Sequence, residues 1–444
     1  MKLTKALQWP RQFAVASLAV SLTVPRASTQ ESTSINAATV PAHSLEALVA
    51  EALGKNPELQ FYNAEINAAK AGRKTADVLN NPEVSVGAGE KRVSGGGLGA
   101  EGLAWSVSVA QPFEWPGRIG LRKAIANHDI ELAELGYARF KVALSGRVRT
   151  LAYGLFAAQE TSAAAAAVAG RFKALRDVLV QRDPAGLTPL LETRVIEATE
   201  LNAQRKASVA LLAAQAALLE LNQLRGASLD TRLTISQAGF SFHPSLPDRS
   251  VLLAAARTNN FELRTRAVEL AQQGFRVKLA KNERFPSISA GPAYSEENAG
   301  NDRERLIGVG VSLPLPLWNR NSGNIGVAQA RELQAQTALH VAHREVERKV
   351  LEAALTYETK LGEMAKWRPD SVQHFKEAAE LADRHYRLGA VPISTYVELQ
   401  KQYLDAVEGL LDTKKEALEA ATQLEVLTGL PLPLSPIPPA EEKK

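Results

Sequence analysis

Cysteine is absent from the 444 residues, which excludes disulfides, thiolate metal ligands and a cysteine nucleophile. An excess of one sign of charge is also missing, because the chain has 52 Lys and Arg residues and 48 Asp and Glu residues, interspersed along its length. The net charge of +4 is not gathered into a basic stripe, so no nucleic-acid partner is expected. Aromatic residues make up only 6% of the chain, and alanine, the best helix former, is frequent instead.

The N-terminus is typical of a secretory signal peptide spanning residues 1–28. Lys2, Lys5 and Arg11 precede a short apolar stretch at 13–24, and small residues follow it. Beyond this leader, no apolar run reaches the ~18 residues that a membrane-spanning helix needs. A secreted chain of this kind is expected to be soluble or to form a β-barrel, since only helices and closed barrels cross a membrane.

The remainder of the chain is a tandem duplication. The sequence NPEL at 56–59 matches NFEL at 260–263 with an offset of 204, and Gly186 matches Gly389 with an offset of 203. A near-constant register over so many residues indicates two copies of one structural unit. The predicted divisions are an extended N-terminal arm at 29–43, a first repeat at 44–230, a linker at 231–247, a second repeat at 248–430 and a disordered tail at 431–444.

Each repeat is expected to read helix, strand, loop, strand, very long helix, tight turn, long helix. Alternation with a period of two predicts strands, as where Trp105, Val107 and Val109 alternate with small residues. A Gly-rich segment at 94–102 joins the first two strands and, without a Gly-Lys-Ser/Thr ending, is a hairpin loop rather than a phosphate loop. The predicted strands are about 82–90, 103–113, 286–294 and 306–315.

The predicted helices are unusually long. No proline occurs between Pro116 and Pro184, a stretch that as one helix would span roughly 100 Å. The second repeat should be kinked at Pro369. Its return helix carries heptad-spaced apolar residues, although Lys414 fills one slot where an apolar residue is expected.

Four strands cannot close a membrane barrel by themselves, because bacterial barrels need about eight or more. An open strand edge in lipid would leave backbone polar groups without partners, each costing several kcal/mol. Hairpins that enter a membrane must therefore be pooled from several copies. Three copies would supply twelve strands, together with twelve long helices that could form a continuous tunnel.

Three stretches carry a resemblance to a known family: SLE at 44–46 with NPEL at 56–59, QPFEWPGR at 111–118 and LPLPLWNRNSGN at 313–324. Over residues 44–430 the chain resembles the outer membrane efflux protein (TolC-like) family, and the last two stretches resemble its heavy-metal cation efflux (CzcC-like) branch. The fold that this implies is mainly α with a small membrane β-barrel: a trimeric 12-stranded β-barrel, four strands per chain, continued into a long α-helical barrel.

The resemblance also implies a function. The family's members are passive exit ducts of the outer membrane with a large periplasmic part, working as homotrimers with a periplasmic adaptor (membrane fusion protein) and an inner-membrane RND-type pump. No enzymatic activity and no cofactor are expected. The implied cargo is heavy-metal cations, cobalt, zinc and cadmium or copper and silver. The alternatives are a channel for multidrug or type I protein export and, from another class, a soluble periplasmic coiled-coil adaptor, which should have only one helical hairpin.

The resemblance places the helix–helix turns at the periplasmic tip, where family members contact the adaptor and narrow the pore. The matching residues here are Gly186, Leu187, Thr188, Arg387, Leu388 and Gly389. Some members carry pore-facing aspartates after the tip glycine, but this chain has Thr395 and Glu398 at those positions and Glu192 six residues past Gly186. Glu192 and Glu398 are candidates for an acidic ring that would attract cations, the alternative being a solvated helix face.

No catalytic constellation or metal site is expected. His340 and His343 lie three residues apart on a predicted helix, but two ligands do not make a closed metal site. A duct also gains nothing from holding its cargo tightly, since conduction requires release.

Overall fold

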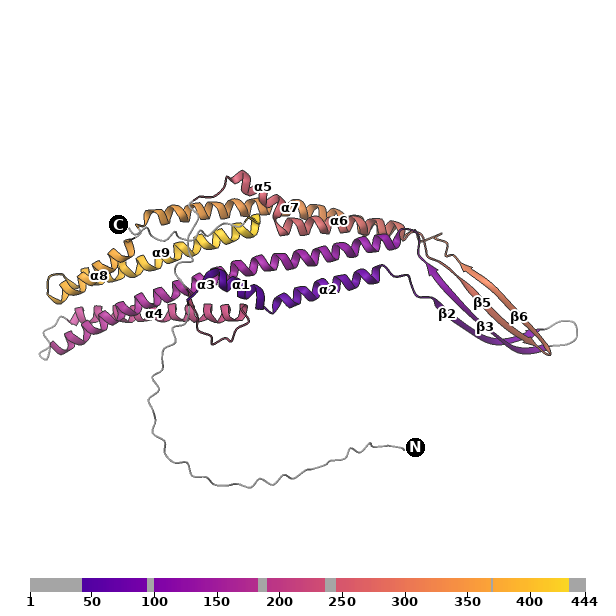
Figure 1. The fold of residues 1–444 in the computed structure, drawn as a ribbon, viewed down its shortest axis with the longest axis horizontal. Coiled ribbons are helices and arrows are strands. Elements are labelled where there is room, and N and C mark those ends of the chain that lie inside the picture. Colours follow the sequence, from indigo (N-terminus) through magenta and orange to yellow (C-terminus); the bar gives the residue numbers. More distant parts are fainter. Residues whose placement is uncertain (1–41, 94–99, 183–189, 236–244, 369, 431–444) are drawn as a thin grey trace, which may run out of the picture. The chain divides into compact units, whose positions relative to one another are not determined.

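A computed structural model describes residues 42–93, 100–182, 190–235, 245–368 and 370–430. Most of these residues are helical, and two small sheets account for the strands (Figure 1). The helices are α1 Leu45–Lys55, α2 Glu58–Ala76, α3 Arg118–Arg182, α4 Leu190–Leu224, α5 Arg249–Asn259, α6 Phe261–Asn282, α7 Ser322–Lys366, α8 Ser371–Arg387 and α9 Ile393–Thr428. The strands are β1 Ala42–His43, β2 Glu83–Val93, β3 Ala100–Phe113, β4 Thr234–Ile235, β5 Ile288–Ala299 and β6 Asp302–Ser312.

Each repeat begins with two helices, not with the single helix that the sequence predicted. The break falls at Asn56 in the first repeat and at Asn260 in the second. The Asn260 carboxamide accepts a hydrogen bond from the Leu263 amide, which caps α6, and donates one to the Leu427 carbonyl at 2.9 Å. Asn56 does the same with the Glu58 amide and, at 3.0 Å, with the Leu224 carbonyl. The repeated motif is thus a helix break that anchors the end of the return helix.

The long helices are supported by apolar seams. Helix α3 has 65 residues, hence a length of about 98 Å, and it packs along α4. In the second repeat α7 ends at Lys366 and α8 begins at Ser371, so the helix is interrupted where a kink was predicted, although residue 369 itself lies outside the described residues. One core cluster joins α1, α3 and α4, a second joins α5, α7 and α9, and a third joins α3, α4, α8 and α9.

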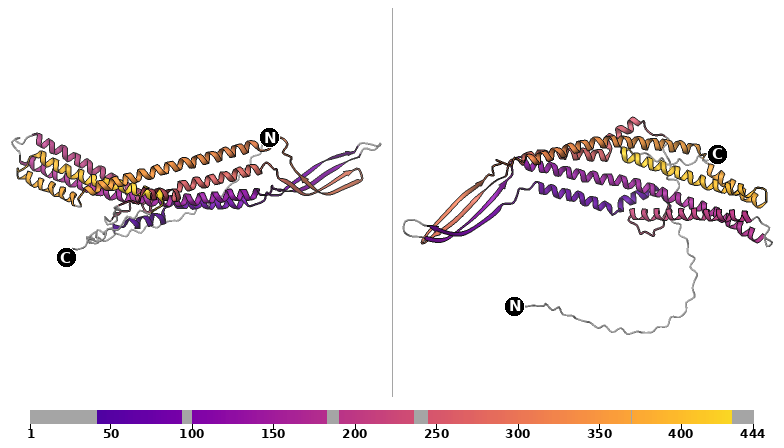
Figure 2. Two further views of the ribbon diagram at one scale, coloured as in Figure 1. Left: turned by 90° about the horizontal axis from the view of Figure 1, so that it is seen from above. Right: turned by 180° about the vertical axis from the view of Figure 1, so that it is seen from behind.

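The main sheet is antiparallel with the strand order β2-β3-β5-β6 (Figure 2). The hairpins of the two repeats meet at the β3–β5 pair, where Val107 lies opposite Tyr294. Within the described residues, the outer edges of β2 and β6 pair with no further strand. The helices next to the sheet repeat this order, since α2 packs on α3, α3 on α6 and α6 on α7. One copy therefore presents matching edges, α2 with β2 on one side and α7 with β6 on the other.

Two features were not expected. A short parallel pairing joins Ala42 to Thr234 and His43 to Ile235, so the arm before the first helix contacts the segment after α4. Helix α4 is also long and apolar enough to cross a membrane by length and composition, with a mean hydropathy of 1.3 over its most apolar 18 residues. Only 22% of that window is buried, although the helix packs on α3 along one side.

Several predicted features lie outside the described residues. They are the signal peptide at 1–28, nearly all of the arm at 29–43, most of the 94–102 loop, part of the 231–247 linker, the tail at 431–444, and the tip residues Gly186, Leu187 and Thr188.

Candidate channel wall and helical tip

One face of the four-stranded sheet is apolar and exposed. The strand register places Val86, Val107, Tyr294 and Ile307 in one row across the four strands on this face. Val86 is 74% exposed and Ile307 is 81% exposed, fractions unusual for aliphatic side chains in water. The same face carries a tilted ring pair, Trp105 against Tyr294, with centroids 5.2 Å apart. A contiguous apolar face of this kind indicates contact with another apolar phase.

The opposite face of the sheet carries mostly small and polar residues. Ser106 and Ser108 of β3 lie on this side, as does Ser295 of β5. Towards the hairpin ends the Lys91 ammonium group contacts the carboxylates of Glu297 at 2.6 Å and Glu304 at 3.2 Å. Apolar and polar faces that alternate along each strand are the pattern of a membrane barrel wall with an aqueous lumen.

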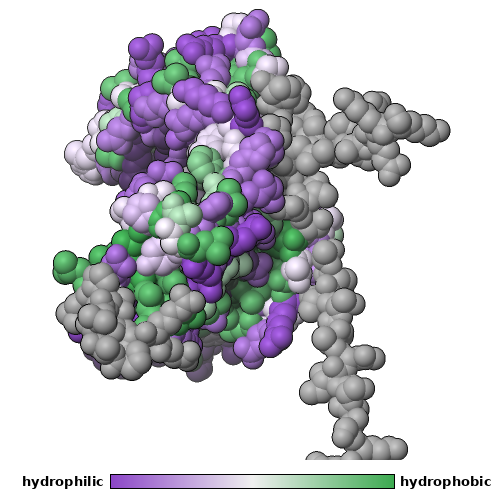
Figure 3. All heavy atoms as spheres, turned by 90° about the vertical axis from the view of Figure 1, so that its left-hand side faces the viewer, coloured by the Kyte–Doolittle hydropathy of each residue, from purple (hydrophilic) through white to green (hydrophobic). Residues whose placement is uncertain are grey.

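The α8–α9 turn lies at the opposite end of the helices. Gly389 has a φ of +74°, a left-handed conformation that favours glycine, and its amide donates to the Tyr386 carbonyl at 2.9 Å. Arg387 forms an ion pair with Asp383, and Leu388 is 80% exposed. Figure 3 looks onto this end and shows hydrophobic side chains on the lower part of the face, over the α3–α4 pair, and mostly hydrophilic ones above.

An aromatic cluster braces the helices behind this turn. The Tyr396 ring is fully buried and stacks on Tyr386, with centroids 5.3 Å apart, and its other neighbour is Phe172 of α3 at 5.2 Å. Burial raises the pKa of the Tyr386 phenol, and so does the nearby carboxylate of Glu192. Glu192 is in α4, so this contact links the α3–α4 pair to the α8–α9 pair near the tip.

The two candidate acidic residues have different surroundings. Glu192 is half-buried beside Tyr386, whereas Glu398 of α9 is exposed and accepts a hydrogen bond from Gln402 at 3.0 Å. Thr395 is exposed as well. One copy therefore does not bring Glu192 and Glu398 together, and a ring of either residue would need further copies.

A buried polar contact deeper in the same bundle was missed from the sequence. The Gln400 side chain is fully buried, donates to the Ala379 carbonyl at 2.7 Å and accepts from Arg171 at 3.1 Å. Arg171 also reaches Glu380 at 3.1 Å, which ties α3 to α8 and α9. One signal was present in the sequence. Residues 396, 400, 403 and 407 follow the spacing of a buried helix face, and position 400 holds a glutamine where an apolar residue is expected.

A metal centre is not formed by the part of the chain that the structure describes. No group of three or more His, Asp or Glu residues there could hold a metal ion. His340 and His343 both lie on α7.

This geometry is shared with known proteins. Residues 252–430 match the outer membrane efflux protein family, which confirms the predicted resemblance over the second repeat. The chain is similar to the cobalt-zinc-cadmium resistance protein CzcC of Cupriavidus metallidurans, with 25% identity over 301 residues that cover 66% of this chain and 68% of that protein.

Solved structures show the same fold. The CmeC outer membrane channel of Campylobacter jejuni superposes with a TM-score of 0.68 at 16% identity, covering 93% of this chain and 95% of that one. The crystal structure of CusC, a protein that forms a transmembrane channel, superposes with a TM-score of 0.67 at 14% identity. The match covers 88% of this chain and 92% of CusC. The predicted fold class, helical with a small antiparallel sheet, is therefore confirmed.

Proposed function

We propose that this protein is the outer-membrane channel of a tripartite efflux system that exports heavy-metal cations, cobalt, zinc and cadmium or copper and silver. It acts as a passive duct, as a homotrimer, with a periplasmic adaptor and an inner-membrane RND-type pump that supplies the energy. The four-stranded sheet carries this proposal, because its apolar face is exposed and, among the residues that the structure describes, its two edges pair with no further strand.

The unpaired edges support pooling of strands between copies. Strand β6 presents a full row of exposed residues, including Val309 at 79% and Val311 at 69%. In lipid this edge would leave many N–H and C=O groups without partners unless another strand paired with it. A β6–β2 contact with the next copy closes the wall, and three copies give twelve strands, a size within the range of bacterial barrels.

The helical layer supports the same assembly. Helix α4 exposes apolar side chains along its length, among them Leu191, Leu201 and Leu212, each more than 60% exposed. Such a stripe in water is unfavourable by about 25 cal/mol for each Å². Contact with other copies or with the adaptor would remove it from water.

The metal cargo is supported by the likeness to CzcC and by the two motifs at 111–118 and 313–324. Multidrug or type I protein export is the alternative cargo within the same class. A soluble adaptor is the alternative of another class, but the exposed apolar sheet face disfavours it.

The test of the cargo is deletion of the gene in its own host and growth on a metal series and on a drug and dye series. We expect sensitivity to divalent cobalt, zinc or cadmium, or to copper or silver, restored by a plasmid copy. Unchanged metal tolerance combined with lost drug or dye resistance would refute the metal assignment and retain the channel.

A further inference from the structure

We propose that Phe61 of one copy inserts into a pocket at the α7 edge of the next copy, and that this contact fixes the register between neighbouring subunits. The inference rests on the proposed assembly of several copies into a ring. It follows from a contact between the two repeats that one chain already contains.

Inside the chain, the repeats meet where α3 and α6 run antiparallel. Arg139 of α3 contacts Glu262 of α6 at 3.2 Å, and Asp129 of α3 accepts a hydrogen bond from Gln272 of α6 at 2.6 Å. These two contacts define the pairing: each step towards the start of α3 is a step towards the end of α6. Thr265 of α6 thus lies opposite the turn of α3 that precedes Arg139.

The duplication allows this pairing to be transferred to the outer edges. Buried residues of α3 recur in α7 at an offset of 202, as Leu144 with Val346 and Val148 with Val350. Buried residues of α2 recur in α6 at an offset of 204, as Leu59 with Leu263. We assume that α7 meets the α2 of the next copy as α3 meets α6. The offset of 204 then puts Phe61 at the position of Thr265, and the offset of 202 puts the α7 turn near residue 338 opposite Phe61.

Both partners of this predicted contact are exposed in one copy, and the Phe61 ring touches its neighbour Tyr62 edge-on. Phe61 is 67% exposed and projects from a face of α2 that also carries Ala68 and Gly72. A pocket of about 840 Å³ opens at the predicted target, lined by Leu333, Thr337, Ala338 and Val341 of α7 together with residues of α6, the end of α9 and Arg139 of α3. Leu333 is 63% exposed and Val341 56% exposed, so the aromatic ring would cover apolar surface on both sides.

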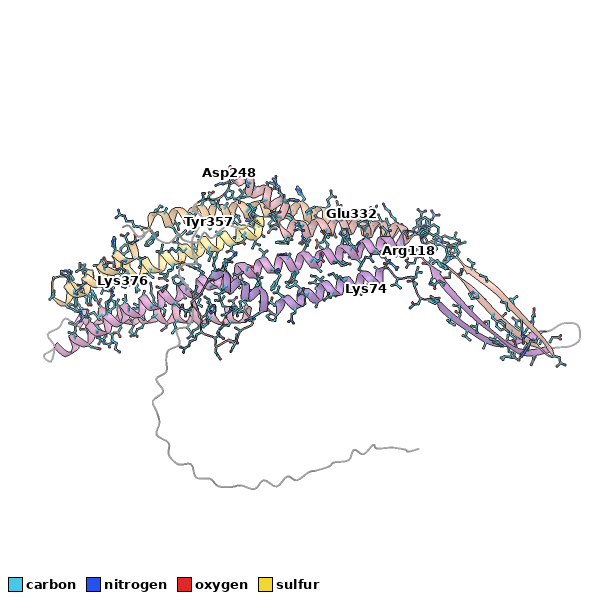
Figure 4. The ribbon with its side chains drawn as sticks, viewed as in Figure 1. Lys74, Arg118, Asp248, Glu332, Tyr357 and Lys376 are labelled. Atoms are coloured by element: carbon cyan, nitrogen blue, oxygen red, sulfur yellow. The ribbon has the colours of Figure 1, made fainter. Side chains whose placement is uncertain are left out.

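The two edges lie far from each other within one copy. Figure 4 labels Lys74 on α2 and Glu332 on α7, on opposite sides of the layer in which α3 and α6 stand between them. A second copy is the occupant that the repeat predicts.

Charge complementarity supports the same register. Arg331 of α7 stands at the position of Asp129, and Glu65 of α2 lies one turn from Ala68, the counterpart of Gln272. Both residues are exposed, and neither belongs to an ion pair formed among the described residues. In the ring, Glu65 of one copy would face Arg331 of the next.

The absence of native cysteine makes a cross-linking test direct. We expect the double variant Phe61→Cys, Ala338→Cys, oxidised in detergent, to run as covalent dimers and trimers on a non-reducing gel. Phe61→Cys with Val327→Cys is the matched control, because Val327 is also exposed on α7 but lies three turns away. The control should remain monomeric on the same gel.

Three outcomes separate the claims. A trimer by mass that cross-links only through the 61–338 pair supports the contact. A trimer that cross-links through the control pair, or through neither pair, overturns the contact and leaves the proposed function standing. A monomer by mass before oxidation contradicts the proposed assembly itself.

Charge reversal gives a second readout that does not depend on cysteine. Arg331→Glu should lower the temperature at which the trimer dissociates in mild detergent, and adding Glu65→Arg should restore it. Failure of the second change to restore the trimer would count against the proposed register.

Discussion

Tyr386 and Tyr396 stack face to face across the α8–α9 turn, with ring planes within 15° of parallel. Their stack braces the turn from inside, and the Glu192 carboxylate on the other helical pair is near enough to raise the pKa of the Tyr386 phenol. The tip therefore contains a rigid part, which is the aromatic stack, and one polar link between helical pairs that substitution can remove separately.

Tyr386→Phe removes this link and keeps the ring. If the helical pairs must separate for the tip to open, the variant should open more readily, because the interaction of the phenol with the Glu192 carboxylate is lost. We expect a severalfold shift towards the open state in planar-bilayer recordings, since one polar interaction contributes about 1 kcal/mol and 1.4 kcal/mol corresponds to about tenfold. Glu377→Gln, at an exposed carboxylate of α8 outside the candidate acidic ring, is the control, and equal conductance of Tyr386→Phe and the parent would contradict the link.

Glu398→Ala tests the acidic ring. If three copies place this carboxylate in the pore, its removal should weaken block by multivalent cations and raise ion leakage. The same recordings on Glu192→Ala separate the two candidates, since Glu192 also holds Tyr386. If multivalent cations block the Glu398→Ala channel at the same concentration as the parent channel, Glu398 is on a solvated helix face and not in the pore.

Asn260→Ala should destabilise the second repeat. The change leaves the buried Leu427 carbonyl without its partner, a loss of about 1–3 kcal/mol, and removes the cap of α6, a further loss of about 1 kcal/mol. Thermal unfolding followed by circular dichroism should show a lowered midpoint. Asn63→Ala, at an exposed position of α2, is the control, and an equal midpoint for both variants would mean that the helix break contributes nothing.

Lys414→Leu should stabilise the protein at pH 7. Burial lowers the pKa of Lys414, and its ammonium group forms no ion pair with the described residues. At pH 7, below the pKa of an unfolded lysine, the folded state bears the cost of placing this ammonium group in a poorly solvated position. Because the unfolded state binds more protons between the lowered pKa and about 10.5, the parent gains stability as pH rises through that interval. The advantage of the variant should shrink there, and an advantage that is independent of pH would contradict this.

The fold was largely predictable because it is encoded in local patterns. Period-two stretches such as 103–109 predicted strands, the proline-free stretch predicted α3, and the constant offset predicted the repeat. The helix breaks at Asn56 and Asn260 were missed. Each asparagine donates a hydrogen bond to a carbonyl about 168 residues away, and the local sequence does not reveal that partner. The short β1–β4 pairing was missed for the same reason.

The site was less predictable than the fold. Sequence alignment of the repeats located the turn at Gly389 but gave no sign that Tyr386 reaches Glu192, since α4 and α8 come together only after both helical pairs have folded. The buried hydrogen bond between Gln400 and Arg171 was likewise not predictable, because Arg171 lies on a helix more than 200 residues earlier in the chain.

The mass of the purified, detergent-solubilised protein tests the central claim most directly, since each copy holds only four wall strands. Native mass spectrometry or light scattering corrected for detergent should give three copies per particle. A single copy per particle, with the apolar sheet face covered by its own chain, would contradict the account.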